Sequence, residues 1–219
     1  MTDINENKIN IAYNMDCLEA MKEMKDNEFD LAIVDPPYGL NERLLKGGDK
    51  GAMGSLRKLA DNKVINWDNK TPEKSYFDEL FRVSKFQIIW GANYFLNFLN
   101  KTDGFVVWNK MNGTNALADC ELAWQNIKST TRMFSYHHFS GGVKKKIHPT
   151  QKPVALYKWL LTNYAKQGDK ILDTHLGSGS SRIACYDLGF DFVGYELDKE
   201  YFEAQEKRFI NHINQQGMF

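Results

Sequence analysis

The stretch from Phe29 to Tyr38 limits the folds open to this chain more than any other. Four apolar residues, Leu31 to Val34, are followed at once by Asp35, two prolines and an aromatic residue. A short apolar run that stops in this way predicts a buried strand. The prolines remove two amide donors and fix two φ angles, so neither strand nor helix continues. Ligands bind at the carboxyl ends of strands in open α/β sheets, and we expect a ligand site here.

The residues that follow this predicted strand suit one kind of chemistry. An exocyclic amino group on a nucleobase is a poor nucleophile because its lone pair is delocalised into the ring. The Asp35 carboxylate and the Pro36 carbonyl could accept its two hydrogens, and Tyr38 could stack on the base. The base would first have to leave its duplex, as enzymes that act on bases require. A strand that simply ends at two prolines is the alternative interpretation.

Strand and helix patterns alternate along the rest of the chain. Asp16 and Glu19 have capping-box spacing and predict a helix between strands at 8–13 and 29–38. Such a strand–helix–strand order implies a parallel sheet, so we expect a doubly wound α/β fold. The later predicted elements are a helix from Thr71 to Val83, strands at 86–91, 104–110, 120–126 and 131–139, a helix from Pro153 that is capped at Gly168, a strand from 170, a helix to Leu188, a strand at 192–196 and a closing helix at 198–214.

Length and composition favour one globular domain over residues 1–219, with 42% hydrophobic and 26% charged residues. No apolar run approaches the roughly 18 residues of a membrane span, and the polar N-terminus does not resemble a signal peptide. Cys17, Cys120 and Cys185 lie far apart and lack metal-ligand spacing. They predict reduced thiols in a cytoplasmic protein.

Charge is segregated, although the net charge is zero. Six basic residues and no acid lie between Asn126 and Lys152, which could place a basic stripe against nucleic acid or could be a solvated loop. The aperiodic segment 39–70 is long for a loop, so it is either a substrate lid or disordered.

A second motif has the form of a nucleotide site. A predicted strand leads into Gly177-Ser178-Gly179, a helix follows, and Glu196 ends the next strand. Glycine lets the backbone approach a ligand closely, and an acid about 20 residues further on suits ribose hydroxyls. Arg182 stands where a dinucleotide fingerprint needs a small residue, which disfavours NAD and FAD but is compatible with an adenosyl ligand that has no pyrophosphate. A tight turn with a surface glutamate is the alternative.

Taken in order, these motifs resemble the amino-group DNA methyltransferases of the permuted beta class. The resemblance covers nearly the whole chain and rests on Asp16-Cys17, Asp35 to Tyr38, Trp90 to Tyr94, His148 to Pro153, Asp173 with Gly177 to Gly179, and Glu196. The glycine turn follows Asp-Pro-Pro-Tyr, whereas related RNA and protein methylases place it before, so the order points to DNA. The resemblance implies a Rossmann-like fold with a mixed seven-stranded sheet in circularly permuted order. It also implies S-adenosylmethionine as cofactor, double-stranded DNA as partner and no metal, and it leaves a homodimer open. Since many relatives have a separate target-recognition region, the candidate DNA-recognition segments here are 39–70 and 111–147. The candidate DNA contacts are Arg43, Lys46, Arg57, Lys144, Lys145 and Lys146.

The first residue of the Asp-Pro-Pro-Tyr motif, Asp35, indicates which base is the target. Aspartate at this position is typical of adenine-N6 enzymes and serine of cytosine-N4 enzymes, so the resemblance implies methylation of adenine N6. Cytosine N4 as the target, or a silent subunit that only binds cofactor or DNA, are the alternatives.

The resemblance also implies residue roles. The catalytic residues are Asp35, Pro36, Pro37 and Tyr38, and Asp35 also borders the cofactor. The cofactor-binding residues are Asp16 and Cys17 near its adenine, Glu196 on its ribose, Asp173, Gly177, Ser178 and Gly179 along its methionine part, and Thr150 and Lys152 on its carboxylate. His175 replaces an aromatic residue of the family, and we assign it no chemistry.

Overall fold

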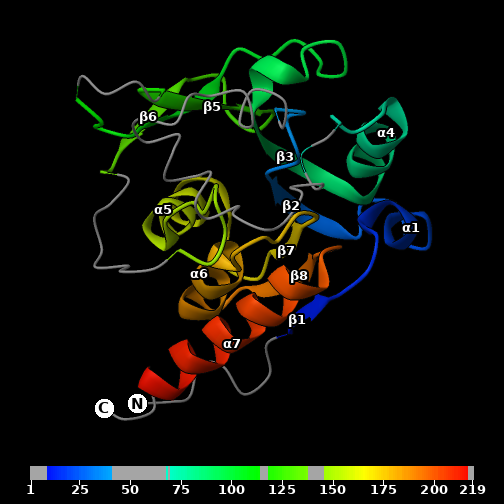
Figure 1. Cartoon of the computed structure of the whole chain (residues 1–219). Helices are drawn as coiled ribbons and strands as arrows, with labels where there is room; N and C mark the ends of the chain where they lie inside the picture. The colour runs from blue at the N-terminus through cyan, green and yellow to red at the C-terminus, as the bar shows by residue number, and fades with distance from the viewer. Residues whose placement is uncertain (1–8, 41–67, 69, 114–117, 138–145, 217–219) are drawn as a thin grey trace.

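The computed structural model describes residues 9–40, 68, 70–113, 118–137 and 146–216. These residues form one mixed sheet of eight strands, one more than expected, which Figure 1 shows at the centre of the molecule. The strands are β1 (Asn10–Tyr13), β2 (Phe29–Val34), β3 (Ser84–Trp90), β4 (Phe105–Asn109), β5 (Cys120–Gln125), β6 (Arg132–Ser135), β7 (Lys170–Asp173) and β8 (Asp191–Tyr195).

The strands lie in the order β1-β8-β7-β2-β3-β5-β4-β6. The first five are parallel to one another, as predicted, and β5 alone among the described strands runs in the opposite direction. β2 and β7 are neighbours at the centre, with Leu31 opposite Ile171. The chain moves outward from this pair on both sides, so the pair marks the switch point at which α/β sheets bind ligands.

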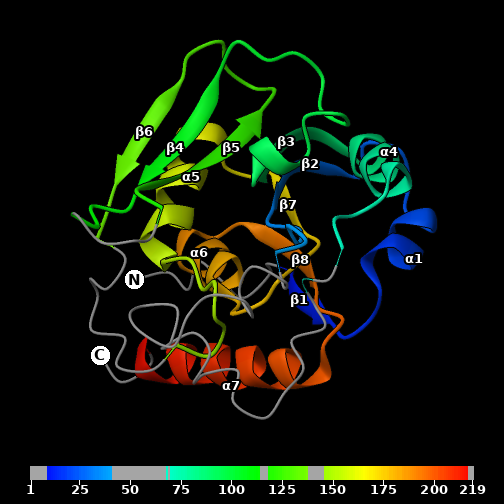
Figure 2. The same ribbon diagram turned by 45° about the horizontal axis from the view of Figure 1, so that its top comes forward.

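Helices cover both faces of the sheet, which confirms the doubly wound fold (Figures 1 and 2). The helices are α1 (Cys17–Lys22), α4 (Lys74–Val83), the 3-10 turn η1 (Ala92–Tyr94), α5 (Val154–Tyr164), α6 (Ser180–Leu188) and α7 (Lys199–Gln216). Figure 1 shows α1 and α4 on one side and α5 and α6 on the other, with α7 beyond α6.

Two helix boundaries differ from the predicted ones. Residue 73 is still extended, with φ −81° and ψ 169°, so α4 begins after Glu73 and not at Pro72. Later in the chain, α5 ends at Tyr164 with Ala165 as its C-cap, three residues before Gly168. Gly168, with φ +95°, instead lies in a turn that is closed by a 2.7 Å bond from the Lys166 amide to the Asp169 carboxylate. Local hydrogen bonds in this turn replace the expected glycine cap.

The β2 side chains divide between two apolar layers. Leu31 and Ile33 pack with α5 and α6, whereas Ala32 and Val34 pack with α1 and α4. Burial on both faces explains why this strand reads as a continuous apolar run. In the described part of the chain, no helix is both long and apolar enough to cross a membrane.

Of the two candidate recognition segments, 111–147 contains β5 and β6 and so contributes directly to the sheet. Segment 39–70 lies outside the described residues, except for residues 39, 40, 68 and 70.

Two leucines on this side of the sheet provide a matched test of the packing. Leu80 of α4 is 0% exposed within the α1/α4 layer, and Leu96, which follows η1, is 66% exposed. We expect Leu80→Ala to lower the free energy of unfolding by about 2–5 kcal/mol, because it leaves a cavity. Leu96→Ala should change it by less than about 0.5 kcal/mol. Urea unfolding of both variants checks this, and equal losses would contradict the described packing.

Candidate active site

The carboxyl ends of the parallel strands bring four predicted acids to one edge of the sheet. Asp35 follows β2, Asp173 ends β7, Glu196 follows β8, and Asp16 lies shortly after β1. A cavity of about 350 Å³ opens at this edge. Nine predicted site residues line it: Asp16, Cys17, Asp35, Pro37, Thr150, Lys152, Gly177, Ser178 and Glu196. Pro36, Tyr38, Asp173 and Gly179 are not part of its wall.

The glycine turn has the form predicted for a nucleotide site. Gly177 and Gly179 have φ of +52° and +72°, a backbone region that favours glycine. Glu196 closes the turn, because its Oε2 accepts the Gly177 amide at 2.7 Å while its Oε1 accepts the Asp198 amide at 2.9 Å. From α7, Arg208 donates to the Ser178 carbonyl at 2.6 Å. The turn is therefore held from both the strand and the helix side.

Asp173 supports this turn from behind. Its Oδ1 accepts the His175 amide at 3.0 Å, and its Oδ2 accepts the Ser181 hydroxyl. Burial raises the pKa of Asp173 to about 7, although these hydrogen bonds oppose the shift. The side chain thus organises the backbone around the cavity.

Two histidines in the cavity wall were missed as site residues. His148 stacks edge-on against Tyr201, and its Nδ1 lies 3.1 Å from the Thr150 hydroxyl. His175 packs edge-on against Tyr76. Burial lowers the pKa of each histidine to about 4, so both are neutral at pH 7. His148 lies in the His148-to-Pro153 motif, and that position was the signal that could have found it.

Several other wall residues also carried no predicted role. They are Met15, Gln151, Tyr157, Thr174, Leu176, Leu197, Asp198 and Tyr201. Most are sequence neighbours of predicted residues, so their place follows from the chain path and not from a separate motif.

The Asp-Pro-Pro-Tyr segment folds back on itself at the cavity. The Tyr38 hydroxyl donates to Asp35 Oδ1, so the aromatic ring and the carboxylate are held together. Gly91 leaves room for that ring, because a Cβ at this position would lie 2.2 Å from Tyr38 Cε1. Tyr94 stacks on Tyr38 with ring centroids 4.8 Å apart. Asp68 holds the next turn by accepting the amide of residue 39 at 2.7 Å.

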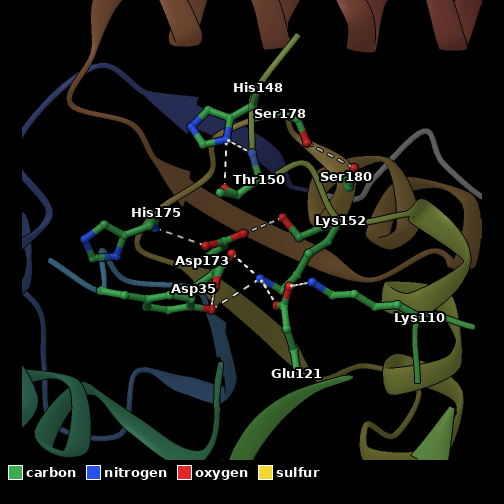
Figure 3. Close-up of polar contacts among 12 residues, drawn as sticks. Asp35, Lys110, Glu121, His148, Thr150, Lys152, Asp173, His175, Ser178 and Ser180 are labelled. Atoms are coloured by element: carbon green, nitrogen blue, oxygen red, sulfur yellow. Dashed lines mark hydrogen bonds and ion pairs between the residues drawn. The ribbon is translucent and has the colours of Figure 1, made fainter. Parts of the chain in front are cut away.

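The Lys152 ammonium lies on Asp35. It donates to Asp35 Oδ2 and also lies 3.0 Å from Glu121 Oε2, as Figure 3 shows. Glu121 Oε1 in turn lies 2.5 Å from Lys110 Nζ. The resemblance implied that Lys152 meets a cofactor carboxylate, but here its partners are two carboxylates of the protein. Glu121 and Lys110 were not predicted; an acid in the apolar strand 120–125 was the available signal.

Only one of the six predicted DNA contacts, Lys146, lies within the described residues. Arg43, Lys46, Arg57, Lys144 and Lys145 lie outside the described residues. Lys146 is half-buried, and burial together with the nearby Lys110 lowers its pKa to about 8.

Known proteins with similar sequences are bacterial methyltransferases. The chain is 25% identical to the Type II methyltransferase M.HpaI of Haemophilus parainfluenzae, over 90% of this chain and 73% of that protein. It is also 25% identical to the Type II methyltransferase M2.DpnII of Streptococcus pneumoniae, over 93% and 90% of the two chains.

The sequence model of a DNA methylase family matches residues 108–207. The match runs from β4 into α7 and includes the glycine turn and Glu196. Together with the Type II methyltransferase relatives, this match supports a place for the chain in the N-4/N-6 DNA methylase family. The match does not distinguish adenine from cytosine.

Solved structures of DNA methyltransferases share the fold of this chain. The M1.HpyAVI–SAM complex superposes with a TM-score of 0.57 at 24% identity, over 90% of this chain and 97% of that one. The cytosine-N4-specific PvuII DNA methyltransferase superposes with a TM-score of 0.60 at 12% identity, over 93% and 91%. These similarities confirm the methyltransferase fold.

The raised pKa of Asp173 predicts how the free energy of unfolding of this protein depends on pH. Its folded-state pKa of about 7 lies above the ordinary value of 3.8, so the folded state binds this proton more tightly than the unfolded state. The resulting stabilisation is complete below the ordinary pKa and is lost as pH rises through 7.

We expect the free energy of unfolding of the wild type to fall by a few kcal/mol, relative to Asp173→Asn, between about pH 4 and pH 8. Asparagine has no carboxyl proton to lose and can still accept the His175 amide. Urea unfolding across this pH range measures the difference, and parallel profiles for the two proteins would contradict the expectation.

Proposed function

We propose that this DNA methyltransferase transfers a methyl group from S-adenosylmethionine to N6 of adenine in double-stranded DNA. The observation that carries the proposal is the Asp35 carboxylate, which borders the cavity and is fixed by Tyr38 at one oxygen and Lys152 at the other. A fixed acceptor at a ligand cavity is what activation of an amino group requires.

The charge of the cavity supports a cationic cofactor. Its described wall contains four carboxylates, from Asp16, Asp35, Glu196 and Asp198, and one ammonium, from Lys152. The wall histidines are neutral at pH 7, as the lowered pKa values show. A ligand with one sulfonium, one ammonium and one carboxylate carries net positive charge and complements this wall. Bound here, S-adenosylmethionine would supply an electrophilic methyl group.

Most of the residues proposed to hold the cofactor line the cavity. The Gly177–Gly179 turn, fixed by Asp173, leaves its backbone open to a close ligand, and Ser178 lies within it. Glu196 accepts one amide at each oxygen, so each keeps a further lone pair for a ribose hydroxyl. We assign Asp16 and Cys17 to the adenine end. Thr150, at the wall, remains the candidate for the cofactor carboxylate.

The reaction itself needs orientation more than a chemical group from the protein. Asp35 and the Pro36 carbonyl would accept the amino hydrogens and turn the nitrogen lone pair out of the ring plane. Positive charge develops on that nitrogen as the methyl group arrives, and fixed acceptors stabilise it. Tyr38 would stack on the flipped base; Tyr94 already covers one of the two faces of its ring.

Adenine is favoured over cytosine by the aspartate that opens the motif. A carboxylate is a stronger acceptor of amino hydrogens than the serine hydroxyl typical of cytosine-N4 enzymes, because the bond is charge-assisted. We further propose that the basic residues of 39–70 and 111–147 contact the DNA.

Analysis of the methylated nucleosides tests which base is the target. We expect transfer of labelled methyl from S-adenosylmethionine to unmethylated genomic DNA, with N6-methyladenine as the labelled nucleoside after digestion. Labelled N4-methylcytosine would confirm methyl transfer but would overturn the assignment of adenine as the target base. Cofactor binding without transfer would point instead to a silent subunit.

The acceptor role predicts the behaviour of Asp35→Ala. The methylation rate should fall by at least about 100-fold, because a fixed acceptor at the developing charge is lost. Calorimetric binding of S-adenosylmethionine should change little, since the turn around Gly177 is untouched and Lys152 keeps Glu121 as its partner.

Asp30→Ala is the matched control. Asp30 lies in β2, the strand that Asp35 follows, but it pairs with Lys85 away from the cavity, so this variant should methylate at the wild-type rate. Joint loss of cofactor binding and methylation in Asp35→Ala would show that Asp35 is structural.

A further inference from the structure

A line of alternating charges leads to Asp35 from the far half of the sheet. Lys110 follows β4, Glu121 belongs to β5, and Lys152 lies between Glu121 and Asp35. Figure 3 shows the four side chains meeting head to head. The β4–β5 pairing sets this geometry, because Glu121 lies opposite Trp108 and the Lys110 amide bonds the Asp119 carbonyl at 2.9 Å.

Lys152 depends on this line because its side chain is only 2% exposed. A buried ammonium is costly unless it is paired with carboxylates. Burial alone would lower the pKa of Lys152, but the carboxylates of Asp35 and Glu121 outweigh it and raise that pKa above its ordinary value. The lysine therefore stays a charged donor to Asp35.

A cation beside Asp35 creates a difficulty for the proposed reaction. Positive charge develops on the amino nitrogen held by Asp35, and an uncompensated ammonium nearby would oppose it. Glu121 carries the charge that cancels this opposition, at 3.0 Å from the ammonium. Lys110, on the far side of Glu121, limits the cost of burying that second carboxylate.

We propose that Glu121 is a positioning residue for methyl transfer, which holds the Lys152 ammonium on Asp35 and offsets its charge. Glu121 acts through Lys152 and does not touch the base. The inference rests on the proposed function, since it concerns the same acceptor.

The other groups around Lys152 determine how its titration is read. They are Tyr38 after β2, His148 before α5, Tyr157 in α5, and Lys110 with Lys146 beyond Glu121. Burial keeps the pKa of both tyrosines well above the usual range and lowers that of His148 to about 4. Lys146, with a pKa of about 8, titrates in the working range and must be resolved from Lys152.

The test combines Glu121→Gln with two readouts. Single-turnover methylation should be about tenfold or more slower than wild type at pH near 7.5, and should fall by a further tenfold or so by pH near 9.5, where the wild type stays level. The lysine side-chain NMR signal that is absent from Lys152→Met should titrate at lower pH in Glu121→Gln than in wild type. Calorimetric cofactor binding should be unchanged.

Two further variants separate positioning from folding. Lys110→Gln removes a like charge, so the Lys152 signal should titrate at the same or higher pH, and the alkaline loss of rate should not appear. Glu28→Gln breaks a similar pair with Lys170 at the other end of β2 and should match wild type in both readouts.

The outcomes distinguish the two proposals. A wild-type pH profile and Lys152 signal in Glu121→Gln would overturn the positioning role. So would a lowered Lys152 titration in Lys110→Gln, which remains measurable if the first variant does not fold. Absence of methyl transfer by the wild type would overturn the proposed function, while the NMR titration still reports the Glu121 contact.

Discussion

The parallel pairing of β2 with β7 is the contact on which the site depends. It joins segments from opposite ends of the chain, with Ala32 opposite Leu172. Because both strands run in the same direction, their following residues emerge at one edge, and this places Asp35 beside Asp173 and the glycine turn. Further parts of the site follow strands that lie outward from this pair: Glu196 follows β8 on one side, and Gly91 follows β3 on the other.

Burial decides which titratable groups of the site are neutral and which are charged. Burial holds both wall histidines neutral at pH 7, as the lowered pKa of His148 and His175 shows. Groups that remain charged are paired: burial opposes ionisation of Glu121, but Lys152 and Lys110 hold its pKa below the ordinary value. The cavity wall thus stays negatively charged, while the buried charges next to it, from Lys110, Glu121, Lys152 and Asp35, are paired with one another.

Local patterns were sufficient for most of the fold. Apolar runs predicted the strands, and glycine with an acid at the right spacing predicted the turn around Gly177, because strand burial and backbone conformation are largely local properties. The site was predictable where a motif carried it, as at Asp35 and Glu196. The Glu121–Lys152 contact was not, because it joins segments that only the reversed strand β5 brings together. The strand patterns also predicted β6, within 131–139, and only the seven-stranded sheet implied by the resemblance was one strand short. The cap at Gly168 was misjudged because an aspartate side chain, Asp169, decides the turn there.

The order of the strands determines which part of the sequence encodes each half of the sheet. The sheet half that carries the proposed cofactor side, β1, β8 and β7, is encoded by the two ends of the sequence. The half beyond β2 is encoded by one uninterrupted middle stretch, from β3 to β6. A middle segment of this kind can diverge, lengthen or be exchanged as one block while both ends stay unchanged. With the proposed function, selectivity for a target sequence and binding of the methyl donor would then change independently within one sheet.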